Sequence, residues 1–111
     1  MIEILVKEKL EEALNVPVFL EQPTDKPSKY LLIERKGMGE SDHLGGSLFI
    51  LQSYAESLYS AATLNKETIS EFKNLIYLDE MVSINLNTDY IFTDMTSKKY
   101  RYQALFDVKH Y

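Results

Sequence analysis

The chain has 111 residues, the length of one ordinary domain, and we expect residues 1–111 to form a single unit. It is 45% hydrophobic and 26% charged, which excludes wholesale disorder. The absence of cysteine excludes disulfides, thiolate zinc sites and cysteine nucleophiles, and the net charge of -5 argues against non-specific nucleic-acid binding.

The N-terminal part predicts a helix followed by an extended segment. Apolar residues recur at helical spacing over residues 1–15, and Asn15 and Pro17 are stop signals. Residues 16–20 are short and apolar and predict an extended piece. The proline-rich residues 22–28 predict a loop.

Two predicted strands flank a glycine-rich segment. Residues 30–36 are rich in Leu and Ile and predict one strand. Residues 47–55 carry apolar side chains on both faces, which predicts a central strand. Between them, residues 37–46 contain all four glycines, and we expect a long flexible loop, because glycine permits positive φ. Connections of this length often contact partners, so this loop is a candidate interaction element.

The C-terminal half predicts one long helix and further strands. Residues 57–78 show helical periodicity, with Ser57 or Ser60 as a possible N-cap. Residues 81–87 and 100–108 alternate between apolar and polar, as strands with one wet face do. Residues 88–97 are polar, with a short extended piece around 90–93. The expected fold is α+β: a mainly antiparallel sheet with an N-terminal helix and one long helix packed on it. The helix residues expected to face the sheet are Leu64, Phe72 and Leu75.

The sequence shows no membrane or secretory segment. The longest apolar runs, such as residues 48–51, are far shorter than the ~20 residues of a membrane helix. The N-terminus lacks a basic region followed by an apolar stretch. We therefore expect a soluble protein without a membrane partner.

No motif marks an enzyme. The glycine-rich segment starts like a dinucleotide fingerprint, but it lacks the third glycine and leads into a strand rather than a helix. Ser41, Asp42 and His43 are adjacent, a spacing that points their side chains apart rather than into a triad. The other histidine, His110, has no evident set of converging ligands. We expect no enzymatic activity, no cofactor and no metal.

Charge is distributed unevenly along the chain. No basic residue lies between Lys73 and Lys98, and four acidic residues form one acidic stretch there: Asp79, Glu80, Asp89 and Asp94. The final strand region instead begins with a basic cluster interleaved with tyrosine. This cluster is a weak nucleic-acid pattern, and a solvated strand rim or pairing with an acidic partner is the preferred interpretation. Separate acidic and basic regions suit head-to-tail association, which can close into a ring. The candidate subunit or partner interface comprises Met38, Glu40, Asp42, His43, Asp79, Glu80, Asp89, Asp94, Lys98, Lys99 and Arg101.

Several short sequence segments are typical of one protein family. They are Val16-Pro17-Val18-Phe19, the proline segment 23–27, residues 30–37, and Leu51-Gln52-Ser53-Tyr54-Ala55 followed by residues 57–64. Through these segments and the order of elements, the chain from Leu5 to Val108 resembles the tail terminator (tail completion) proteins of long-tailed bacteriophages. Relatives commonly have tryptophan where Tyr54 stands, a change that keeps an aromatic side chain.

The resemblance implies a structural subunit that forms a hexameric ring. The ring would cap the tail tube, end its polymerisation and present a docking surface to the filled head. The implied partners are further copies of the chain, the tail tube protein and a head-closure connector protein. The implied location is the virion tail, assembled in the bacterial host cytoplasm. Another head–tail connector role, or a small nucleic-acid-binding module using residues 98–102, remain the alternatives, and an enzyme with a dispersed carboxylate site is the least favoured hypothesis.

Overall fold

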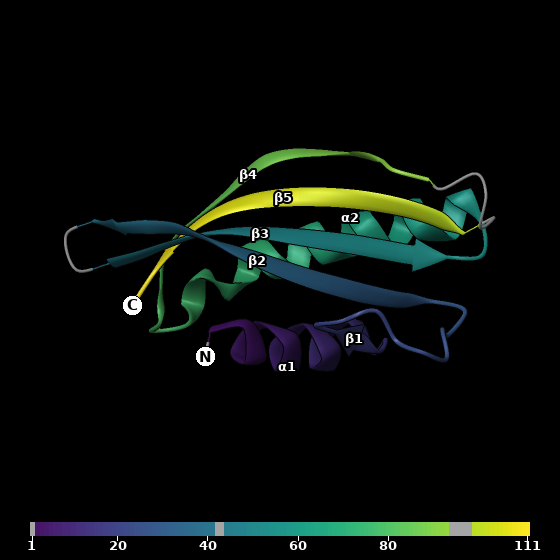
Figure 1. Ribbon diagram of the computed structural model, residues 1–111, viewed down its shortest axis with the longest axis horizontal. Coiled ribbons are helices and arrows are strands. Elements are labelled where there is room, and N and C mark those ends of the chain that lie inside the picture. The colour runs from purple at the N-terminus through teal and green to yellow at the C-terminus, as the bar shows by residue number, and fades with distance from the viewer. Residues whose placement is uncertain (1, 42–43, 94–98) are drawn as a thin grey trace.

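The computed structural model describes residues 2–41, 44–93 and 99–111. Within these residues, five strands form one sheet, and two helices share its hydrophobic core (Figure 1). The elements are α1 (Ile2–Leu14), β1 (Val18–Phe19), β2 (Tyr30–Ser41), β3 (Leu44–Ala55), α2 (Leu58–Asn74), a 3₁₀ turn η1 (Leu75–Tyr77), β4 (Met81–Ile91) and β5 (Tyr100–His110). The predicted α+β class, with one long helix, is confirmed.

The sheet has the strand order β1-β2-β3-β5-β4. The pairs β2–β3, β3–β5 and β5–β4 are antiparallel, as expected. Only β1 is parallel to its neighbour, with Val18 opposite Leu31 and Phe19 opposite Leu32. The two apolar faces of residues 47–55 correctly predicted a central strand, because β3 lies in the middle of the sheet.

Both helices begin or end at the predicted signals. Asn15 follows α1 with φ 55, a left-handed conformation that asparagine tolerates, and its N–H donates to the Glu11 carbonyl at 3.0 Å. Ser57 caps α2, since its Oγ accepts from the Ser60 N–H at 3.1 Å. These local bonds satisfy backbone groups that a helix end leaves without helical partners.

The main core lies between α2, α1 and one face of the sheet. Phe72 on α2 packs between Phe49 and Phe106, with ring centroids 5.5 and 4.4 Å apart. Leu64, Phe72 and Leu75 are all buried, as their helical spacing predicted. Val6 and Leu10 bring α1 into the same cluster.

The glycine-rich segment differs from the prediction. Residues 37–41 and 44–46 are strand, so the expected loop over 37–46 is wrong for these residues. Gly37 lies opposite Ser47 and Glu40 opposite Gly45, with a bulge between Gly37 and Glu40. Gly39 adopts φ 93 inside this bulge, a conformation that favours glycine. Glycine therefore serves a bend within a long hairpin rather than a loop.

A second glycine makes room for a side chain. A Cβ on Gly45 would lie 3.0 Å from Cε1 of His110 on the neighbouring strand. The ring of His110 thus occupies the space that a side chain at residue 45 would need. The predicted loop residues Asp42 and His43 lie outside the described residues.

The strand β4 is longer than the predicted 81–87. Its pairing with β5 shifts register between Met81 and Ser83 and again between Leu86 and Thr88. A bulge inserts one residue, and this changes which side chains face the core. The alternation therefore stops near residue 87 although the strand continues to Ile91.

Candidate interaction surfaces

The predicted interface residues do not form one surface. Asp79 and Glu80 precede β4, whereas Lys99 and Arg101 lie where β5 begins, beside the other end of β4. An eleven-residue strand spans about 33 Å at ~3.3 Å per residue. Asp89 pairs opposite Ala104, in the half of the sheet that contains the basic residues. The expectation of a single acidic region is therefore wrong for the described residues; Asp94 and Lys98 lie outside them.

The Arg101 side chain is bound within its own chain. Its Nε donates to the Phe92 carbonyl at 2.7 Å, and Nη1 donates to the Tyr54 hydroxyl at 2.9 Å. The guanidinium carbon lies 4.1 Å from the Phe92 ring centroid and 5.5 Å from that of Tyr54. Cation–π contacts of this kind add to the hydrogen bonds. Arg101 thus fastens the end of β4 to β3 and β5.

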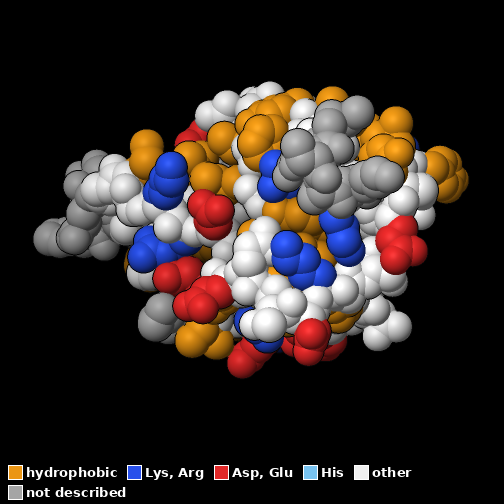
Figure 2. Space-filling view, turned by 45° about the vertical axis from the view of Figure 1, so that its right-hand side comes forward, with side chains coloured by type: hydrophobic (Ala, Val, Ile, Leu, Met, Phe, Trp, Pro, Cys, Tyr) orange, Lys and Arg blue, Asp and Glu red, His pale blue; other side chains and the backbone are white. Residues whose placement is uncertain are grey.

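The Lys99 side chain is also held by its own chain. Its Nζ donates to the Pro27 carbonyl at 3.1 Å and lies 5.8 Å from the centroid of the Tyr30 ring. Lys99 therefore anchors the proline-rich loop to the sheet. Figure 2 shows basic side chains gathered around exposed hydrophobic ones on this side of the molecule.

Tyrosine and glutamine side chains form a network on the sheet face opposite the main core. The Tyr54 hydroxyl accepts from Gln22 Nε2 at 2.8 Å and donates to Gln52 Oε1 at 3.1 Å. Gln52 Nε2 donates to Gln103 Oε1 at 2.9 Å, and Gln103 Nε2 donates to the Tyr90 hydroxyl at 2.6 Å. The network crosses β3, β5 and β4, and no motif in the sequence marked it. The sequence signal for this network was that Gln52 in β3 and Gln103 in β5 each occupy a position on the strand face opposite the main core.

Two tyrosine rings stack beneath this network. Tyr30 and Tyr54 lie with ring centroids 4.6 Å apart and an interplanar angle of 5°. Burial raises the pKa of Tyr30 to about 12, and the neighbouring Tyr54 adds to this rise while Arg101 opposes it. The Tyr30 hydroxyl stays protonated and donates to Gln22 Oε1 at 3.2 Å.

A second polar chain connects α1, β2, β3 and β5 near the hairpin. Arg35 Nε lies 3.3 Å from Glu3 Oε2, and Arg35 Nη1 donates to Ser47 Oγ at 2.9 Å. Ser47 Oγ lies 2.7 Å from His110 Nε2, and His110 Nδ1 lies 3.1 Å from the Tyr111 carbonyl. A hydrogen bond to its own backbone N–H and the neighbouring Arg35 lower the pKa of Glu3, although burial opposes them.

The hydrogen bonds of His110 orient its ring and fit a neutral ring with the proton on Nδ1. Arginine only donates, so Ser47 Oγ accepts from Arg35; a carbonyl only accepts, so His110 Nδ1 carries its proton towards Tyr111. In the neutral ring, His110 Nε2 then accepts the Ser47 hydroxyl proton. A serine bonded to a histidine is also the arrangement of an activated nucleophile. Ser47 is only 1% exposed, however, so the pair ties strands together rather than facing solvent.

One side of the sheet ends in a partly open strand, which we name the β2 edge (residues 33–41). The Leu31 N–H donates to the Pro17 carbonyl at 3.0 Å, so backbone alternation directs the N–H and C=O of Ile33, Arg35 and Gly37 to the same side. In the described chain, β1 pairs only with residues 31 and 32 of this side. An open groove of about 380 Å³ lies beside the β2 edge, lined by Glu3, Leu20, Ile33, Glu34, Arg35 and Lys36.

The opposite side of the sheet ends in the β4 edge (residues 81–91). The Phe92 N–H donates to the Arg101 carbonyl at 2.7 Å, so alternation directs the backbone groups of Asp89 and Ile91 away from β5. Among the described strands, only β5 pairs with β4. Val82 and Ile91 on this edge are 40% and 50% exposed.

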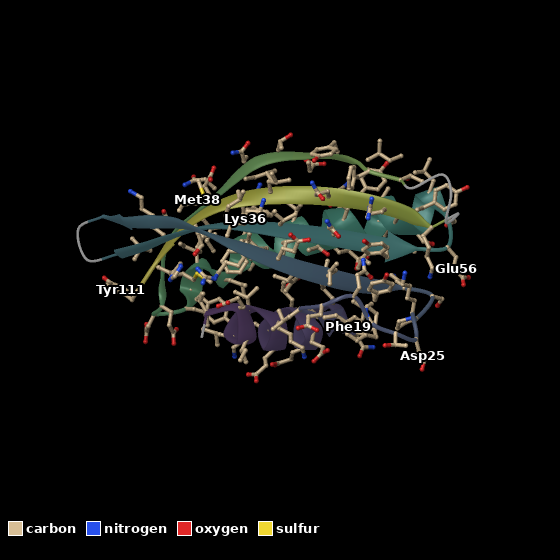
Figure 3. The ribbon with its side chains drawn as sticks, in the orientation of Figure 1. Phe19, Asp25, Lys36, Met38, Glu56 and Tyr111 are labelled. Carbon is tan, nitrogen blue, oxygen red and sulfur yellow. The ribbon has the colours of Figure 1, made fainter. Side chains whose placement is uncertain are left out.

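The β2–β3 hairpin extends the β2 edge beyond both helices (Figure 1). Figure 3 shows Lys36 and Met38 in this hairpin half of the molecule, and Asp25 and Glu56 at the opposite end. Met38, a predicted interface residue, is 63% exposed. The backbone of Glu40 belongs to the same strand.

Comparison with known proteins assigns no family. No protein-family model matches the chain, and no curated protein matches it. Within residues 2–41, 44–93 and 99–111, no cluster of three or more His, Asp or Glu side chains could hold a metal ion. None of the helices in the described chain has the length and hydrophobicity needed to cross a membrane.

Proposed function

We propose that this chain is a structural subunit of a bacteriophage or prophage tail. It forms a ring that caps the tail tube, ends tube polymerisation and provides the surface to which the head joins. The observation that carries this proposal is that, among the described residues, the sheet ends in two unlike edges with unpaired strand residues, the β2 edge and the β4 edge. Open strand edges are templates for pairing, and contacts between unlike surfaces run head to tail and close into a ring when the rotation between neighbouring copies allows it.

The hairpin and the family resemblance support the same proposal. The order of helix, strands, long helix and strands agrees with the subunit that the resemblance implies. The hairpin projects past the helices and exposes Met38, which suits contact with a neighbouring copy or with the tube protein. The partners are then further copies of the chain, the tail tube protein and a head-closure connector, within the virion tail.

The length of tails made without the protein tests this function. Deleting its gene from the phage or prophage should give overlong tubes without heads, because nothing then stops polymerisation. Restoring the gene in trans should restore normal length. Tubes of normal length in the deletion strain would contradict the terminator role and favour a connector.

The mass of the assembled protein gives a second measurement. Six copies of a 12.9 kDa chain should sediment as one closed species in the presence of tube ends. Retention on DNA at moderate salt, without assembly, would instead favour the nucleic-acid-binding module.

A further inference from the structure

We infer that the β4 edge of one copy pairs with the β2 edge of the next, so that one sheet continues from subunit to subunit. This inference rests on the proposed ring and adds to it the pair of edges that meet. The occupant of each open edge is therefore a second copy of this chain. Four features of the structure lead to this pairing.

Strand direction is the first feature. Each neighbouring pair in the series β2, β3, β5 and β4 is antiparallel, so β2 and β4 run in opposite directions. A second copy in the same orientation would therefore place its β2 antiparallel to β4. The helices of both copies would lie on the same face of the shared sheet. Copies related by rotation about a ring axis have this common orientation.

The height of the open backbone groups is the second feature. Across the ladders, Gly37 is level with Ile84, and Ile33 is level with Asp89. The β4 residues that lie opposite Gln103 and the later odd-numbered residues of β5 direct their backbone N–H and C=O groups towards β5. Ile84 and Asp89 are not among them, so their backbone groups point away from β5, towards a neighbouring copy. The segment 84–89 of β4 is one residue longer than the segment 33–37 of β2, and the bulge between Leu86 and Thr88 accommodates this extra residue.

The groove beside β2 is the third feature. Beside β2, β1 pairs only through Val18 and Phe19, and the strand ends before Leu20. The groove of about 380 Å³ follows, lined by four consecutive β2 residues, 33–36. The β4 strand of a second copy could pair with β2 in this groove, directly beyond the end of β1.

Charge and edge chemistry are the fourth feature. The one charged residue of β4 is Asp89, whereas residues 33–36 of β2 contain Arg35 and Lys36 against Glu34. Asp89 contacts Asn65 of α2 and Arg35 contacts Glu3 of α1, so both charged side chains lie on the helical face. β4 also contains no lysine or proline, residues that commonly protect exposed edges from pairing.

Proline substitution tests the edges directly. Gly37→Pro and Asp89→Pro each remove an outward N–H, so neither costs a ladder bond within the subunit. Gly37 has no positive φ, and no atom lies within 4 Å of a Cβ built on it, so its matched control Gly37→Ala fits. Asp89→Glu, which keeps both the charge and the outward N–H, is the control for β4. Sedimentation should show that both proline variants lose the ring while both controls keep it, and circular dichroism should show the same fold in all four. Proline variants that assemble like the unchanged chain would overturn the pairing.

Cysteine cross-linking tests the same contact without proline. The chain has no cysteine, so each introduced thiol is unique. Lys36 and Asn85 are level, exposed and on the face opposite the main core. Mixing Lys36→Cys with a tagged Asn85→Cys should give a mixed disulfide dimer, identified by its mass. Ser83→Cys tests a register shifted by two residues, and Lys66→Cys on the exposed side of α2 is the negative control.

The outcomes separate this inference from the proposed function. Absence of a cross-link with both Asn85→Cys and Ser83→Cys overturns the edge pairing. If a ring forms nevertheless, the terminator role stands with another interface. If the edges cross-link but tails lacking the protein have normal length, the pairing stands and the terminator role fails.

Discussion

The two faces of this sheet are built from the same strands but are closed in different ways. On the helical face, Phe49, Phe72 and Phe106 form a dry core under α2. On the other face, Ile50 and Tyr54 are also buried, at 8% and 5% exposure, although no helix of the described chain lies over them. There, tyrosine, glutamine and arginine side chains lie across the strands and bond to one another. A sheet face can thus be covered by its own polar side chains, provided that their hydrogen bonds have good geometry, because an unsatisfied buried polar group is destabilising.

Truncation of the helical-face core should have the largest effect. Phe72→Ala removes the ring that packs between Phe49 and Phe106. We expect the free energy of unfolding to fall by about 3–5 kcal/mol, because the loss of a buried ring leaves a cavity. Urea denaturation measures this, and a loss below ~1 kcal/mol would mean that the core does not depend on α2 as described.

Removal of one hydroxyl should weaken the opposite face by less. Tyr54→Phe keeps the ring but leaves Gln22 and Arg101 without their acceptor and Gln52 without its donor. We expect a loss of about 1–3 kcal/mol, since partly buried polar groups lose their partners. Tyr90→Phe, which removes a single acceptor at the edge of the network, is the control and should cost less. Equal losses would show that Tyr54 is not the centre of the network.

Alkaline pH should weaken the face that contains Tyr30. The pKa of Tyr30 is raised to about 12, so the folded state holds this proton more tightly than the unfolded chain, whose tyrosine pKa is about 10. This contribution to stability is complete below pH ~10 and is lost as the pH rises through the folded pKa. Urea midpoints measured across this range should fall more steeply for the unchanged chain than for Tyr30→Phe. Parallel curves would contradict the shift.

Loss of one cation–π contact should have the smallest effect. Phe92→Leu removes the ring 4.1 Å from the Arg101 guanidinium but keeps the backbone carbonyl to which Arg101 Nε donates. We expect a loss of about 0.5–1 kcal/mol in a urea titration. A loss as large as that of Tyr54→Phe would mean that the ring, rather than the hydrogen bonds, holds Arg101 in place.

The interface predictions show where sequence reasoning reached its limit. Asp79 and Asp89 are near in sequence, yet an extended strand separates them along the sheet. Lys99 and Arg101 formed an evident basic cluster, but their bonds to Pro27 and Tyr54 depend on segments far away in the chain. Residues that are about ten positions apart can therefore lie at opposite ends of one strand, and a charge cluster in the sequence can be engaged by distant segments.

The sequence by itself determined the helices, the main strands and the core of this protein. These features follow from local properties of the chain: the hydrophobic periodicity, the Ser57 cap and the Asn15 stop. Each of them depends on hydrogen bonds or side-chain spacing within a few residues of the same segment. Tertiary structure alone decided the parallel β1 strand, the bulge at Gly39, the contact of His110 with Ser47 and the two open edges. These features depend on pairing between distant segments, and the energy of such pairing depends on geometry that a single strand's sequence does not contain.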